Sequence, residues 1–276
     1  MTNALRVGWL AIAVLPQSLS ASNGASGAST VGFWLAWGIW VIVALAILVP
    51  HPLSLVTVRL LAPLLALHTG ATVLEESTLR WSTVLALLLM VAVSATAFSA
   101  RYGSVHAQAA AYGHERRHLL RPPMAVLAPL ALVWLVVAAL GAVAMRGEQL
   151  AVSLSATALF IALAVFMLRR ALVLSRRWLV FVPAGIAVHD PLLLRDTFMV
   201  RKHDLRALRD AASNTEAFDI TGTTWGTPLE LVLSHPHDVS LSPFGARLTG
   251  TLDRLHVTAL LVAPSRPHIA LADFPR

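Results

Sequence analysis

Cysteine is absent from this chain, and charged residues are scarce. The first absence excludes disulfides and thiolate metal sites. Charged residues make up 13% of the 276 residues, whereas a soluble globular domain has about 25%. Hydrophobic residues reach 57%, and the mean hydropathy is +0.72. Much of the surface is therefore expected to face lipid. The chain also lacks P-loop, GxGxxG and GxSxG motifs, so it carries none of these nucleotide-binding or hydrolase signatures.

Long apolar runs dominate the first two thirds of the chain. A membrane span takes about 20 apolar residues, and five segments have this character: 31–49, 54–74, 81–100, 124–145 and 150–168. Trp34, Trp37 and Trp40 lie in the first half of the first segment, where tryptophan suits the membrane interface. Residues 31–177 are thus predicted to form an α-helical transmembrane bundle of about five spans.

Residues 1–30 have a different pattern. A short apolar run, 7–15, follows Arg6 and precedes Pro16 and a Ser-rich stretch. This pattern is typical of a signal peptide, cleaved between Ser18 and Ala25. An uncleaved apolar segment at the membrane, followed by a Ser-rich extracytoplasmic linker, fits the residues equally well.

The basic charge follows the apolar segments. The net charge is +7, with twelve Lys and Arg against four Asp and Glu before Trp178, and nine against ten from Trp178 onward. Nucleic-acid binding is not needed to explain this excess, because cytoplasmic loops of membrane proteins are rich in arginine. The hinge, residues 101–123, and the block 169–177 each hold four arginines, whereas the alternate loops hold only Arg80 and Arg146. We therefore expect a multi-pass plasma-membrane protein with its hinge and C-terminal region in the cytoplasm.

Residues 178–276 are expected to form a small β-rich domain. Strands are predicted at 178–182, 186–189, 197–201, 217–221, 229–233 and 256–262, and a helical turn at 204–211. Proline and glycine at 183 and 185 favour a hairpin turn between the first two strands. Trp178, Phe181, Ile186, Leu231 and Leu260 are the predicted core.

The run RRWLVFVPAGIAVHDPLLLRDTFMVRKHDLRAL, 176–208, resembles bacterial membrane proteins that carry a pleckstrin-homology-like domain after their last span. The hinge, together with DITGTTWGTPLELVL and VAPSRP further on, is similar to an uncharacterised family of bacterial multi-pass proteins. The resemblance covers the hinge and most of 176–267. It implies scaffold, lipid-contact or interaction roles and assigns no site residues. Little chain remains after Val262 for the long closing helix of the pleckstrin-homology fold.

The hinge contains one chemical motif, His114-Glu115-Arg116-Arg117-His118. It matches the HExxH pattern of zinc peptidases, in which two histidines on one helix face bind zinc and the glutamate activates water. The Ala-rich segment 104–120 is predicted to be helical up to Pro122. However, both intervening residues are arginines, Gly113 disfavours a helix by about 1 kcal/mol, and no third ligand is evident.

We therefore predict no catalytic, cofactor-binding or metal-binding residues. Glu115 is expected to pair with its neighbouring arginines. Anionic lipid headgroups are expected to contact Arg116, Arg117, Arg169 and Arg170. His235-Pro-His237 has the composition of a metal ligand pair, but an exposed turn is the preferred interpretation.

The predicted function is an integral membrane accessory, scaffold or regulatory protein with a membrane or cytoplasmic protein partner. One alternative is a zinc-dependent membrane peptidase that uses His114, Glu115 and His118. Another is the membrane subunit of a transport or envelope-lipid system. The sequence identifies neither a substrate, nor a partner, nor an oligomeric state.

Overall fold

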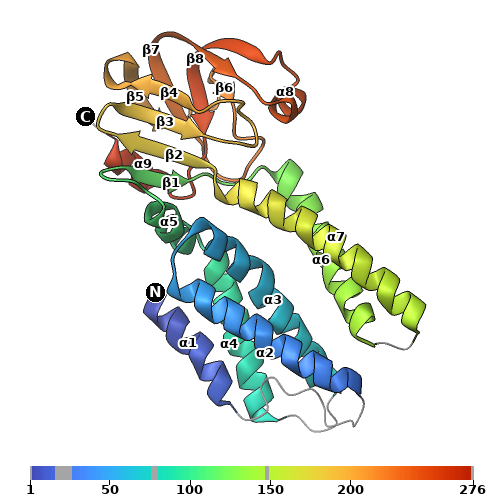
Figure 1. Ribbon diagram of the computed structural model, residues 1–276. Coiled ribbons are helices and arrows are strands. Elements are labelled where there is room, and N and C mark those ends of the chain that lie inside the picture. Colours follow the sequence, from blue (N-terminus) through green and yellow to red (C-terminus); the bar gives the residue numbers. More distant parts are fainter. Residues whose placement is uncertain (1, 16–26, 76–79, 147–148, 275–276) are drawn as a thin grey trace. The chain divides into compact units, whose positions relative to one another are not determined.

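The computed structural model describes residues 2–15, 27–75, 80–146 and 149–274 (Figure 1). The chain divides into two compact units. The first comprises Met1–Tyr102 and Ala131–Arg169, and the second comprises Gly103–Leu130 and Arg170–Arg276. The expected cleavage region, 18–25, lies outside the described residues, so the signal-peptide alternative stays a prediction.

The first unit is helical. Its helices are α1 (Thr2–Val14), α2 (Gly27–Leu48), α3 (Pro52–Glu75), α4 (Trp81–Phe98), most of α6 (Met124–Arg146) and most of α7 (Leu150–Ser175). Trp9 and Trp40 tie α1 to α2, because each indole N–H donates to the other residue's carbonyl. Arg59 of α3 donates a hydrogen bond to the Ala97 carbonyl near the end of α4, at 2.9 Å. Its guanidinium is therefore hydrogen-bonded within the protein.

Three described helices are long and apolar enough to cross a membrane: α3, α6 and α7. A fourth results if α4 and α5 (Ala100–Ala109) count as one span with a 62° bend. That bend falls at Ser99, whose backbone is extended, so the third expected span ends at Phe98. The expected apolar segments therefore fall on helices, whereas the number of five spans stays a prediction.

The second unit contains two four-stranded sheets. In the first sheet, β1 (Arg116–Leu119), β2 (Trp178–Val182), β3 (Gly185–His189) and β4 (Phe198–Arg201) pair antiparallel in that order. The second has the order β5-β7-β8-β6 and comprises β5 (Leu205–Asp210), β6 (Phe218–Asp219), β7 (Leu229–Ser240) and β8 (Arg254–Val262). Only β6 runs parallel to its neighbour. The remaining elements are the 3₁₀ turn η1 (Lys202–Asp204), α8 (Pro243–Thr249) and α9 (Pro267–Asp273).

All six predicted strands are present, with shifted ends, and the β-rich prediction for the C-terminal region is confirmed. The predicted helical turn at 204–211 is wrong, because Leu205–Asp210 forms β5 and pairs with β7. Side chains from both sheets form one core. Phe181, Ile186, Leu231 and Leu260 are buried there, and Trp178 is half-buried.

The hinge contributes a strand to this unit. The predicted helix 104–120 is wrong: α5 ends at Ala109, Gly113 adopts a φ of +58°, and β1 pairs with β2. A positive φ is accessible to glycine but interrupts a helix. The backbone of the hinge then continues beside the segment after β8, because Arg121 N–H donates to the Ala263 carbonyl at 2.8 Å. The first sheet therefore includes residues from before and after the apolar pair α6 and α7.

Candidate functional site

The HExxH motif is divided between two kinds of structure. His114 and Glu115 lie in the exposed or partly exposed turn before β1, whereas His118 is buried within β1. The helix face that a zinc peptidase needs for its two histidines is not formed at these residues. The His118 ring packs against Phe181, with 5.0 Å between ring centroids, and its Nε2 lies 3.3 Å from a carboxylate oxygen of Asp273.

The Glu115 side chain stabilises the turn before β1. Its carboxylate accepts from Arg117 at 2.7 and 3.0 Å and from the Tyr112 backbone N–H at 3.2 Å. The hydrogen bond from Arg117 is the main reason that the pKa of Glu115 lies below its ordinary value. The Arg117 guanidinium also covers the Trp178 ring, 4.6 Å from its centroid. Arg117 is therefore engaged within the protein. The side chains of Arg116, Arg169 and Arg170 are exposed.

A buried ion pair joins the residue before β2 to the residue after β3, and its arginine also bonds to the hinge. Arg177 directly precedes β2 and directs Nε and Nη2 to the Asp190 carboxylate at 2.8 and 2.6 Å, with both side chains at most 1% exposed. Its Nη1 donates to the Arg121 carbonyl at 2.7 Å. The other Asp190 oxygen accepts from the backbone N–H groups of Leu192 and Leu193. In the sequence, Arg177 belongs to the block of arginines that follows the last apolar segment. Nothing in the residues around Arg177 indicates that Asp190 is its partner.

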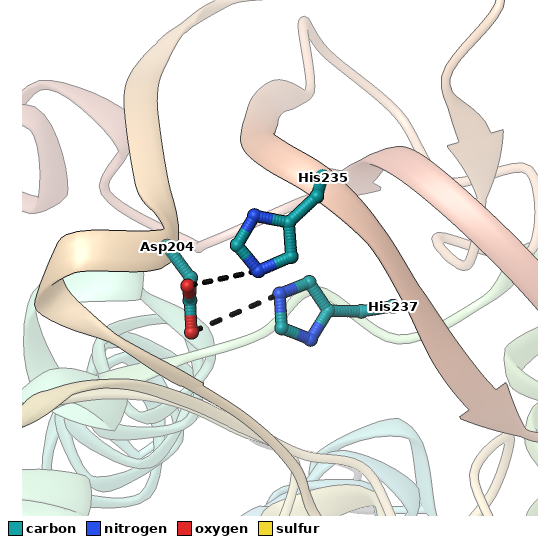
Figure 2. A group of neighbouring side chains, drawn as sticks. All are labelled: Asp204, His235 and His237. Carbon is teal, nitrogen blue, oxygen red and sulfur yellow. Dashed lines mark ion pairs between the residues drawn. The ribbon is translucent and has the colours of Figure 1, made fainter.

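Three potential metal ligands meet where η1 lies beside β7. Within the described residues, Asp204, His235 and His237 form the one group close enough to hold a metal ion, and their donor atoms all lie within 4.8 Å of one another. His235 Nε2 is 3.0 Å from Asp204 Oδ1, and His237 Nε2 is 3.9 Å from Oδ2 (Figure 2). We call these three residues the Asp-His-His group. It is placed by a β-strand and a 3₁₀ turn, and not by the exposed turn expected at His235-Pro-His237.

Two features of β7 explain this placement. Alternate side chains of a strand point to the same face, so histidines two residues apart can act together. Leu205 pairs with Leu233, so the residue before β5 lies beside the residues that follow Leu233 in β7. The β7–β8 register also shifts between Val232 and His237, and this bulge accommodates Pro236, which has no N–H for the ladder.

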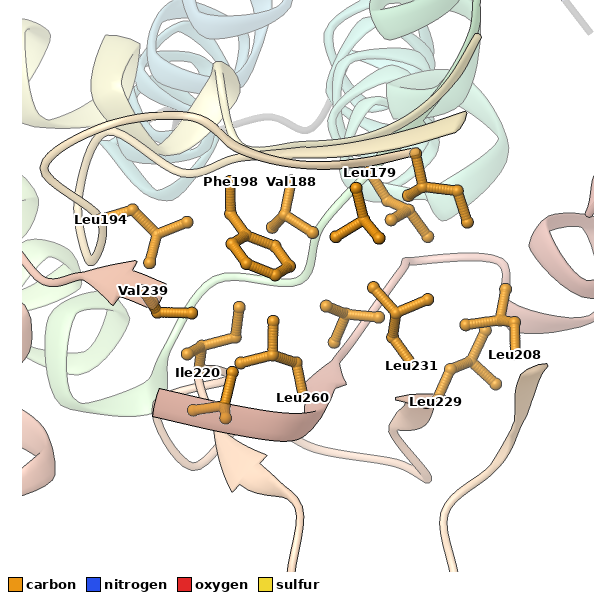
Figure 3. Packing of buried hydrophobic residues seen from close by; sticks show 14 of the residues in the cluster. Leu179, Val188, Leu194, Phe198, Leu208, Ile220, Leu229, Leu231, Val239 and Leu260 are labelled. Atoms are coloured by element: carbon orange, nitrogen blue, oxygen red, sulfur yellow. The ribbon is translucent and has the colours of Figure 1, made fainter. Parts of the chain in front are cut away.

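The group lies at the margin of the hydrophobic core. The His237 ring meets Phe198 edge-on, with 6.4 Å between centroids. Figure 3 shows Phe198 among the core side chains that face Val239 and Leu260 across the two layers. Asp204 is buried, His237 is 23% exposed and His235 is 59% exposed. The group is therefore anchored on one side and open to solvent on the other.

Comparisons with protein families, curated proteins and solved structures give no match to this chain.

Proposed function

We propose that this protein is an integral membrane accessory protein that anchors a β-rich interaction domain at the cytoplasmic face of the plasma membrane. The proposal rests on the pairing of β1 with β2, because β1 directly precedes the apolar helices α6 and α7 in the chain and β2 directly follows them. No catalytic step is assigned to it, and its ligand is a protein partner bound by the β-rich unit.

The β1–β2 ladder restricts membrane topology. A hydrogen-bonded sheet cannot be divided by a bilayer, since strand N–H and C=O groups need partners on the same side. Leu119 pairs with Trp178 at one end of this ladder, and only four residues separate β1 from α6. In the proposed topology, α6 and α7 therefore enter and leave the membrane on the same side as the β-rich unit.

The arginines support the cytoplasmic side. Four lie in the hinge and four in 169–177, which favours retention of both regions in the cytoplasm. The exposed Arg116, Arg169 and Arg170 suit contact with anionic headgroups, at about 1 kcal/mol per residue near the surface. Arg117 was also expected to contact headgroups. In the structure it bonds to Glu115 and covers the Trp178 ring, so we assign it a structural role.

The β-rich unit supports a pleckstrin-homology-like interpretation. Two sheets enclose one core, and α9 closes the chain with Ala270 buried against that core. The parallel β6 and the seven-residue α9 depart from the usual pattern of that fold. Such domains act by binding, and this agrees with the resemblance to bacterial multi-pass proteins.

Topology is tested by single-cysteine labelling, for which the natural chain is a cysteine-free background. We expect a membrane-impermeant maleimide to label Gln149→Cys, between α6 and α7, in intact cells. Ser213→Cys, in the β-rich unit, should be labelled only after the cells are opened. Labelling of Ser213→Cys from outside would contradict the proposal.

The docking role is tested by photo-crosslinking in cells. A crosslinking residue replaces Met199, which is 64% exposed on β4, and the matched control position is Leu132 of α6, also 64% exposed. A discrete protein adduct is expected from position 199 and should be lost when Asp190→Asn destabilises the domain. Adducts from position 132 alone would show that the membrane helices, and not the β-rich unit, hold the partner.

A further inference from the structure

We infer that Asp204, His235 and His237 form a binding site for a divalent transition-metal ion, with zinc as the best match. This inference is independent of the proposed docking function. It rests on three donor groups that come from two separate segments and converge on one point.

The donor set selects the metal class. Two imidazoles and one carboxylate are ligands of zinc and other late first-row dications, whereas magnesium and calcium prefer sites made only of oxygen. Zinc bonds of about 2.0–2.2 Å place tetrahedral donor atoms roughly 3.3–3.6 Å apart. The three donor atoms lie within 4.8 Å of one another, so small side-chain movements would bring them to this spacing.

The burial of the ligands also favours a metal. A buried carboxylate is costly unless it is paired, and Asp204 has three histidines near its oxygens. His237 Nε2 is buried and lacks a hydrogen-bond partner in this arrangement. A cation between the two residues would satisfy both groups, because the carboxylate gains a counter-charge and the imidazole nitrogen gains a bond.

The remaining coordination positions face outward. The rings of His235 and His237 stack, with 5.0 Å between centroids and 23° between planes, and the more exposed His235 can rotate to close on the ion. His203 Nε2 also lies 3.4 Å from Asp204 Oδ1, but His203 does not belong to the group of mutually close donor atoms. A water molecule would complete the coordination.

A bound ion would join η1 to the bulge of β7. Both segments are irregular: η1 is a single 3₁₀ turn, and β7 loses its register with β8 between Val232 and His237. Because the ion binds the folded arrangement of the three ligands, its binding stabilises that arrangement by mass action. Zinc is therefore expected to raise the urea concentration at the midpoint of unfolding of β5 and β7.

The test is a calorimetric titration of the full chain in detergent with Zn²⁺ and, separately, with Mg²⁺. The protein must carry no polyhistidine tag. We expect one Zn²⁺ per chain and no comparable binding of Mg²⁺. Cobalt substitution gives a second readout, since Co²⁺ bound at this site should show visible absorption bands that disappear when Zn²⁺ is added.

Two variants and one control assign the ligands. His237→Gln and Asp204→Asn should weaken Zn²⁺ affinity at least tenfold, and hydrogen exchange of β5 and β7 without metal shows whether the variants remain folded. If Asp204→Asn does not fold, the exposed His235→Gln replaces it. His256→Gln is the matched control, because His256 is an exposed histidine that pairs with Asp238 and does not belong to the Asp-His-His group. Stoichiometric binding that persists in folded His237→Gln, or the absence of Zn²⁺ binding to the natural chain, would overturn the inference.

Discussion

Replacing Asp190 by asparagine should strongly destabilise the β-rich unit. The substitution removes the charge that balances Arg177, whose side chain is 1% exposed, but keeps an oxygen for the N–H groups of Leu192 and Leu193. Breaking a buried ion pair from one side costs about 3–5 kcal/mol, because the other charge stays buried without compensation. A domain is typically stable by about 5–15 kcal/mol, so this single change should remove a large part of the total.

The measurement is urea unfolding of the full chain in mild detergent, followed by hydrogen exchange of peptides from β2 and β3. This readout reports on the sheet and is insensitive to the apolar helices. Arg176→Met is the matched control, because Arg176 is the adjacent arginine and is exposed. It should change the free energy of unfolding by less than about 0.5 kcal/mol.

A double variant separates charge from packing. Arg177→Met combined with Asp190→Asn removes both charges and keeps the acceptor for Leu192 and Leu193. Most of the lost stability should return, except for about 1 kcal/mol for the hydrogen bond from Arg177 to the Arg121 carbonyl. The reasoning is refuted if Asp190→Asn alone costs less than about 1 kcal/mol, or if the double variant is no more stable than the single one.

Two further predictions concern the first sheet. Burial lowers the pKa of His118 below its ordinary value, the nearby Asp273 opposes this, and Arg116 and Arg266 lower it further. The unfolded chain then binds the proton more readily, so the free energy of unfolding should fall as pH drops from about 7.5 to 5.5, and less steeply in His118→Phe. Gly185→Ala should destabilise the sheet by about 1–3 kcal/mol, because its Cβ would lie 2.0 Å from the Val200 carbonyl oxygen. An unchanged urea midpoint in Gly185→Ala would contradict this.

Local patterns predicted much of the β-rich unit. Leu229, Leu231 and Leu233 occupy alternate positions, with Glu230 between the first two, and all three leucines are buried in β7. The proline and glycine of Pro183-Ala184-Gly185 indicated the hairpin between β2 and β3. One available signal was overlooked, because Ser242 followed by Pro243 is typical of a helix start and caps α8 through the Gly245 N–H.

The hinge was mispredicted because its strand depends on a distant partner. An Ala-rich segment favours a helix locally, but Arg116–Leu119 pairs with Trp178–Phe181 beyond two apolar helices. The Asp-His-His group was missed for a related reason. His235 and His237 are visible as a pair in the sequence, whereas Asp204 joins them only through the β5–β7 register. The ion pair of Arg177 and Asp190 likewise depends on how the end of β3 lies beside the start of β2.

The position of β1 in the chain has a consequence for biosynthesis. The ribosome makes β1 almost sixty residues before β2 begins, and at about 5–20 residues per second this delay lasts roughly 3–12 seconds. Throughout that interval α6 and α7, which are long and apolar enough to cross a membrane, are being made and β1 has no partner strand. The first sheet is therefore completed only after the second of these helices has left the ribosome, and a nascent chain stalled between them should retain an unpaired strand that quality-control factors can recognise.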